Sequence, residues 1–147
     1  MATPEGMREL TDSECWELMR ANEQQGGGVG RIAVAIMNQP DIFPVNYVVD
    51  HGSVIFRTAE GTKLAAAVLG TSVAFEADGY EPEVGEAWSV VIRGRAVELE
   101  QVHGRFDAAD LPLFPWHASP KNRVVRIEPE IITGRRFVVV EDRRPVD

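Results

Sequence analysis

The chain has 147 residues, 44% of them hydrophobic and 26% charged, which is typical of one globular domain. Its formal net charge of −8 argues against a nucleic-acid-binding surface, because neutralising phosphates requires a local excess of basic side chains. The single cysteine excludes an intrachain disulfide, and neither a signal peptide nor a long apolar run is present. We therefore expect one cytoplasmic domain over residues 1–147 that contacts no membrane, with loose tails at 1–10 and 141–147.

The first predicted element is a helix that begins near Thr11. Thr11 and Glu14 have the spacing of a capping box, and apolar residues follow at positions 15, 16, 18 and 19. We expect this helix to pack through Trp16 and Met19. The glycines that come next, at positions 26–28 and 30, follow a helix and precede a strand. A dinucleotide-binding fingerprint has the opposite order, so we interpret these glycines as a connector.

Most of the remaining chain is rich in β-forming residues. The ranges 29–37, 42–49 and 53–58 are separated by short turns and predict a meander of antiparallel strands. Gly94 lies inside a long predicted strand, where a glycine often marks a bulge. Six or seven strands with few short helices predict a mainly β protein, an antiparallel split β-barrel. The later predicted elements are a short helix at 63–69 and strands at 71–77, 87–99, 122–127 and 131–140.

The stretch IFRTAEGTKLAAAVLG joins a strand, a polar turn and an alanine-rich helix. Two cations and two hydroxyls lie close together in it: Arg57, Thr58, Thr62 and Lys63. Arginine and lysine together suit a phosphate, and a helix beginning at Lys63 would direct the free N–H groups of its first turn to the same point. The alternative is that Thr62 is only an N-cap and that Arg57 pairs with Glu60 on the surface.

A second unusual stretch, DIFPVNYVV, carries a proline inside a predicted strand. Pro44 removes one hydrogen bond of the sheet and therefore marks an edge or a bulge. Backbone groups freed in this way could face a heteroaromatic ligand, and Asn46 adds both a donor and an acceptor. The alternative is an edge strand that the proline merely protects.

Other chemically useful side chains form no recognised catalytic set. Glu76 and Asp78 alternate on one strand face, where a solvated surface explains them equally well. The three histidines lack the spacing of metal ligands, and no nucleophile lies beside a base. We therefore predict no metal site and assign no catalytic residue. A cofactor that brings its own reactivity fits better.

Three segments resemble one known family. They are FPVNYVVDHGSVIFRTAEGTKLAAA (43–67), WSVVIRGRAVEL (88–99) and RVVRIEPEIITGRRF (123–137). They resemble the pyridoxamine 5'-phosphate oxidase-like superfamily of FMN-binding split barrels, and within it the small nitroimidazole-reductase-like branch. The resemblance implies a homodimer with FMN, or a deazaflavin coenzyme, at the subunit interface. The C-terminal segment departs from the one that binds substrate in true pyridoxamine phosphate oxidases, so that particular reaction is not implied.

The resemblance also implies positions for the cofactor. The phosphate would be held by Arg57, Thr58 and Lys63, with Thr62 as a further candidate. The backbone and side chains of Pro44, Val45 and Asn46 would border the ring. Trp116 of the partner subunit would cover the ring or shape the substrate pocket. The function implied is an oxidoreductase that moves electrons or hydride between the flavin and an unidentified small organic molecule. The alternative is a non-catalytic module that sequesters a flavin, a haem or a deazaflavin.

Overall fold

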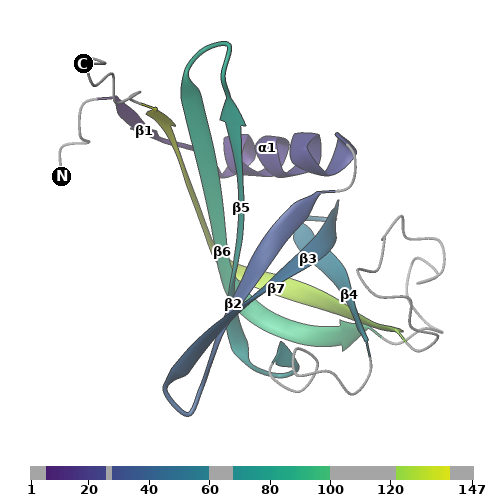
Figure 1. Ribbon diagram of the computed structural model, residues 1–147. Coiled ribbons are helices and arrows are strands. Elements are labelled where there is room, and N and C mark those ends of the chain that lie inside the picture. Colours follow the sequence, from purple (N-terminus) through teal and green to yellow (C-terminus); the bar gives the residue numbers. More distant parts are fainter. Residues whose placement is uncertain (1–5, 26–27, 60–67, 100–121, 140–147) are drawn as a thin grey trace, which may run out of the picture.

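The computed structural model describes residues 6–25, 28–59, 68–99 and 122–139. In these ranges it holds one α-helix and seven β-strands, all seven in a single antiparallel sheet (Figure 1). The elements are β1 (Met7–Glu9), α1 (Asp12–Gln24), β2 (Val29–Ile36), β3 (Gln39–Asp50), β4 (Ser53–Ala59), β5 (Ser72–Glu81), β6 (Glu86–Leu99) and β7 (Asn122–Val138).

The sheet closes on itself. Its strand order is β1-β7-β4-β3-β2-β5-β6, and β6 also pairs with β7, so six of the strands form a barrel. Two strands pair with the same edge of β7: β4 over 122–127 and β1 over 135–137. The predicted split β-barrel, with β2, β3 and β4 as a meander, is confirmed.

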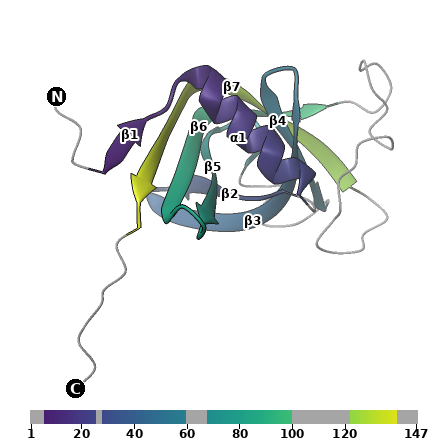
Figure 2. The same cartoon turned by 90° about the horizontal axis from the view of Figure 1, so that it is seen from above.

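Helix α1 lies across one end of this barrel, as Figure 2 shows. The predicted capping box is present: the Glu14 N–H donates to the Thr11 hydroxyl at 3.2 Å, and the Thr11 N–H donates to the Glu14 carboxylate at 3.1 Å. Met19 is fully buried in the barrel core. Tyr47 of β3 connects the barrel to the helix, because its hydroxyl donates to the Met19 carbonyl oxygen at 2.9 Å. This single described helix is too short and too polar to cross a bilayer.

The core inside the barrel is aromatic at its centre. Tyr47 and Phe75 are fully buried and pack edge to face, with ring centroids 5.1 Å apart. Gly30 lies in β2 against the second ring, and a Cβ there would overlap Phe75. Gly30 was expected to be part of a connector, but it is a strand residue that the core requires to be small.

Two predicted boundaries are wrong. Met7–Glu9, expected within a loose tail, forms β1 by pairing with the end of β7. The separate strands expected at 122–127 and 131–140 are one continuous strand. Pro129 does not break it because it lies opposite Gly94, where the register of β6 and β7 shifts at a bulge. The bulge predicted at Gly94 is thereby confirmed. The predicted helix at 63–69 lies mostly outside the described residues.

Candidate functional site

The two unusual stretches of the sequence meet where β3 and β4 separate. The last pair of the β3–β4 ladder is Tyr47 with Phe56. Asn46 and Arg57 are the next residues along each strand, so they face one another just beyond that pair. Arg57 is half-buried. The structure thus brings together residues that the sequence suggested for a phosphate and for a ring.

Strand alternation decides which of the predicted side chains share this face. Side chains alternate between the inside and the outside of the barrel, so Arg57, Asn46 and Pro44 lie on the outer face. Thr58 and Val45 are only 5% and 3% exposed and have the opposite orientation. The Val45 side chain belongs to the core. That Val45 borders the ring stays a prediction. Thr58 does not share the face of Arg57.

The backbone of β3 explains what this face offers to a ligand. The Tyr47 N–H donates to the carbonyl oxygen of Gly28 at 3.1 Å, so its polar backbone groups face β2. In an antiparallel strand the backbone groups of successive residues point to opposite edges. The backbone polar groups of residues 40, 42, 44 and 46 therefore face away from β2, toward an edge that pairs with no strand in the described part of the chain.

This open edge is rich in acceptors and poor in donors. Pro40 and Pro44 have no N–H, and the Ile42 N–H donates to the carboxylate of Asp41 at 2.9 Å. Asn46 is therefore the one residue of the four that can offer an N–H to this edge, whereas the carbonyl oxygens of Pro40, Ile42 and Pro44 lie along it. The prediction that Pro44 marks an edge is confirmed. A planar ligand with both carbonyl and N–H groups along one side is complementary to such an edge.

The side chain of Asn46 is itself fixed. Its Nδ2 donates to the Gly28 carbonyl oxygen at 3.3 Å, which leaves the amide oxygen to accept from a ligand. The remaining predicted cofactor residues, Thr62, Lys63 and Trp116, lie outside the described residues.

The same outer face continues from β3 to β5 through Arg31 of β2. Arg31 is paired with Pro44 on one side and with Glu76 on the other. Its Nη1 lies 2.7 Å from Oε1 of Glu76 and 3.4 Å from Oδ2 of Asp78. The alternation of the two acids on one strand face is thus confirmed. Sequence reasoning missed Arg31, because 45 residues separate it from Glu76 and only the sheet register joins them.

The surroundings of Glu76 disfavour its charged form. Burial, a hydrogen bond with Asp78 and the negative charge of that neighbour, in this order of size, raise the pKa of Glu76 to about 7. The Arg31 guanidinium acts in the opposite direction. Glu76 consequently exchanges a proton near neutral pH, a property common at functional sites.

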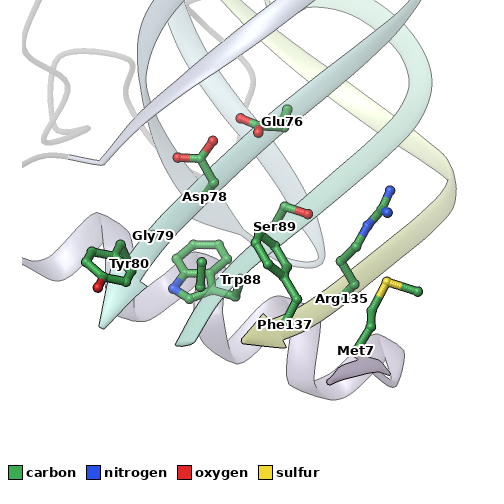
Figure 3. Close-up of a pocket in the computed structure, with 10 residues that line it drawn as sticks. Met7, Glu76, Asp78, Gly79, Tyr80, Trp88, Ser89, Arg135 and Phe137 are labelled. Atoms are coloured by element: carbon green, nitrogen blue, oxygen red, sulfur yellow. The ribbon is translucent and has the colours of Figure 1, made fainter. Parts of the chain in front are cut away.

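A pocket of about 630 Å³ opens beside this acid pair, between β5, β6 and β7 (Figure 3). Asp78 and Glu76 lie on one side of it and Arg135 on the other, with Phe137 between them. Trp88 belongs to the core and is only 6% exposed. Among the described residues, no group of histidine, cysteine and acidic side chains is suited to hold a metal ion.

Comparison with known proteins assigns the family. The sequence matches the pyridoxamine 5'-phosphate oxidase family over residues 11–136. The chain belongs to this family. Among its relatives is the uncharacterised protein Rv0080 of Mycobacterium tuberculosis, 38% identical over 98% of this chain and 95% of that one.

Solved structures agree with this family assignment. An FAD-binding protein from Mycobacterium smegmatis is 40% identical, with a TM-score of 0.78 over 90% of this chain and all of that one. An FAD-binding protein from Mesorhizobium loti is 25% identical, with a TM-score of 0.69 over 88% and 96% of the two chains. A protein from Bacteroides thetaiotaomicron assigned to 5-nitroimidazole antibiotic resistance is 11% identical and shares the fold, with a TM-score of 0.62 over 90% of each chain.

Proposed function

We propose that this chain binds a flavin nucleotide and transfers electrons or hydride between it and a small organic molecule. The observation that carries the proposal is the meeting of Arg57, Asn46 and Pro44 on one outer face where β3 and β4 separate. Membership of the pyridoxamine 5'-phosphate oxidase family supports it. So does the flavin bound by the relatives named as FAD-binding proteins.

The described residues fit such a ligand. The Arg57 guanidinium would bind a phosphate oxygen, and its partial burial would limit the entropy lost on binding. The Asn46 N–H would donate to a ring carbonyl, while a carbonyl oxygen of the same edge accepts a ring N–H. The flavin would supply the two-electron chemistry, and the protein would supply position and charge. No described side chain needs to act as acid or base for this role.

The identity of the nucleotide is part of the proposal. FMN and FAD share the isoalloxazine ring and the first phosphate, and Arg57 serves either of them. FMN or a deazaflavin is the expectation from the sequence, whereas two of the related structures are of FAD-binding proteins. We further propose a homodimer in which Lys63 and Thr62 complete the phosphate site and Trp116 of the partner subunit covers the ring.

Anaerobic reduction tests the catalytic part of the proposal. The purified chain, loaded with FMN or with FAD, is mixed in a stopped-flow instrument with NADH, NADPH or a reduced deazaflavin. We expect at least one donor to bleach the flavin absorbance faster than it bleaches the same flavin free in solution. If every donor reduces bound and free flavin at equal rates, the chain is a non-catalytic flavin-sequestering module instead.

A further inference from the structure

The pocket between β5, β6 and β7 has charges of opposite sign on its two sides. On its acidic side, Arg31 lies within ion-pair distance of both Glu76 and Asp78 and offsets one of their two negative charges. On its other side, Arg135 forms no ion pair with any residue that the structure describes, although Glu9 is its cross-strand neighbour in β1. The side of Arg135 is therefore the side that attracts an anion.

The sheet register sets the distance across the pocket. Asp78 pairs with Ser89, and Ser89 pairs with Arg135. The acid and the arginine are thus two strand spacings apart, about 10 Å between Cα atoms. That width accommodates one aromatic ring with a polar group at each end.

One aromatic ring lies between these charges. Phe137 lines the pocket, and Figure 3 shows it between Asp78 and Arg135. Trp88 belongs to the buried core and packs on Gly79, its cross-strand partner, where a Cβ would lie only 2.5 Å from Nε1 of the indole. An aromatic floor with a few convergent polar groups is the usual composition of a small-molecule site.

We propose that this pocket binds a small aromatic carboxylate, with the carboxylate on Arg135, the ring against Phe137, and a polar substituent facing Glu76. That this ligand is the substrate of the enzyme rests on the proposed function, whereas its binding to the pocket does not. Arg31 connects the two sites, because it pairs with Pro44 at the proposed flavin edge and with Glu76 at the pocket.

Proton uptake should accompany this binding. The charged groups that face Glu76 are Asp78 on its own strand and Arg31 on β2, while its partner on β6 is the uncharged Val91. An anion in the pocket adds negative charge near Glu76 and favours its protonated form, which can donate a hydrogen bond to the ligand. Affinity should therefore fall as pH rises through neutrality.

Calorimetric titration with 4-hydroxybenzoate tests the site on the full chain, with and without flavin. We expect saturable binding at about pH 6 that weakens at about pH 8, because the Glu76 proton is lost in between. Arg135→Ala should weaken binding at least ~tenfold, in line with the loss of a charge-assisted hydrogen bond. Arg135→Lys should retain part of the wild-type affinity. Arg93→Ala, an exposed arginine of β6 that does not line the pocket, is the matched control and should bind like the wild type.

Two further titrations test the role of the Glu76 proton and of the carboxylate of the ligand. Glu76→Gln keeps a hydrogen-bond donor but cannot titrate, so it should bind with little dependence on pH. The uncharged 4-hydroxybenzamide should bind more weakly than 4-hydroxybenzoate to the wild type, and equally weakly to Arg135→Ala.

The proposal is overturned if 4-hydroxybenzoate does not bind, or binds wild type and Arg135→Ala equally. It is also overturned if Arg135→Ala converts a dimer into monomers in analytical ultracentrifugation, because this face is then a subunit interface. A chain that binds no flavin but binds 4-hydroxybenzoate through Arg135 supports the pocket and contradicts only the proposed function.

Discussion

Glu76 links the chemistry of the outer face to the stability of the protein. Its pKa of about 7 in the folded state exceeds that of an unfolded chain, chiefly because of burial and then because of Asp78. Between the unfolded and the folded pKa, the folded protein holds a proton that the unfolded chain does not. This contribution to stability is complete below the unfolded pKa and is lost as pH rises through the folded pKa.

The substitution Glu76→Gln should remove this dependence. We expect the melting temperature of the wild type to fall between about pH 5 and about pH 8, and that of Glu76→Gln to fall less, since a glutamine does not titrate. Thermal unfolding followed by circular dichroism measures both curves. Glu83→Gln, in the exposed turn after β5, is the control and should keep the slope of the wild type. Parallel curves for Glu76→Gln and the wild type would contradict the assignment.

Individual residues differ in how far the sequence predicted their roles. Arg57 and Asn46 stood out because their residue types and neighbours are unusual for a strand. The burial of the Val45 side chain in the core was not foreseen, because its neighbours suggested a ligand and strand parity becomes visible only in the sheet. Arg31 and Arg135 gave no local signal, because they meet the acid pair and the pocket only through cross-strand register.

At the scale of elements, α1 and β7 come unusually close. Gly134 of β7 accepts a hydrogen bond from the Leu10 N–H at 2.9 Å, just before the helix begins. A Cβ at Gly134 would lie 2.5 Å from Sγ of Cys15, which is fully buried. The absence of a side chain on β7 thus lets α1 cover the end of the barrel.

Gly134→Ala should therefore destabilise the protein by about 1–3 kcal/mol, the usual cost of overpacking a well-filled core. Urea unfolding measures the change in free energy. The double variant Gly134→Ala with Cys15→Ala should recover part of the loss relative to Cys15→Ala alone, because the clashing sulfur is gone. Additive effects of the two substitutions would show that the contact with Cys15 is not the cause.

Elements with strong local sequence signals could be predicted, whereas elements that form by pairing with another strand could not. The capping box at Thr11 and the bulge at Gly94 follow from local residue preferences. The short strand Met7–Glu9 has no such signal and exists because β7 offers it an unpaired edge. The continuity of β7 was missed because Pro129 signals a break, and only the bulge of β7 opposite Arg93 and Gly94 of β6 shows why the strand continues.

At the scale of the whole molecule, the barrel arranges its polar chemistry as one band. Arg57, Asn46 and Pro44 lead through Arg31 to Glu76, crossing four adjacent strands of the outer face. The split-barrel class was predictable from the number and spacing of the β-rich runs. The band of polar residues could not be predicted, because it depends on β2 lying between β3 and β5. This strand order becomes visible only in the closed sheet.

The most direct test is an equilibrium titration of the flavin-free chain with FMN and with FAD, followed by quenching of flavin fluorescence. We predict saturable binding of at least one of them at one flavin per chain. Arg57→Ala should bind it at least ~tenfold more weakly, because a charged hydrogen bond to phosphate is lost, while Arg93→Ala binds like the wild type. The account is contradicted if neither flavin binds, or if Arg57→Ala binds as tightly as the wild type.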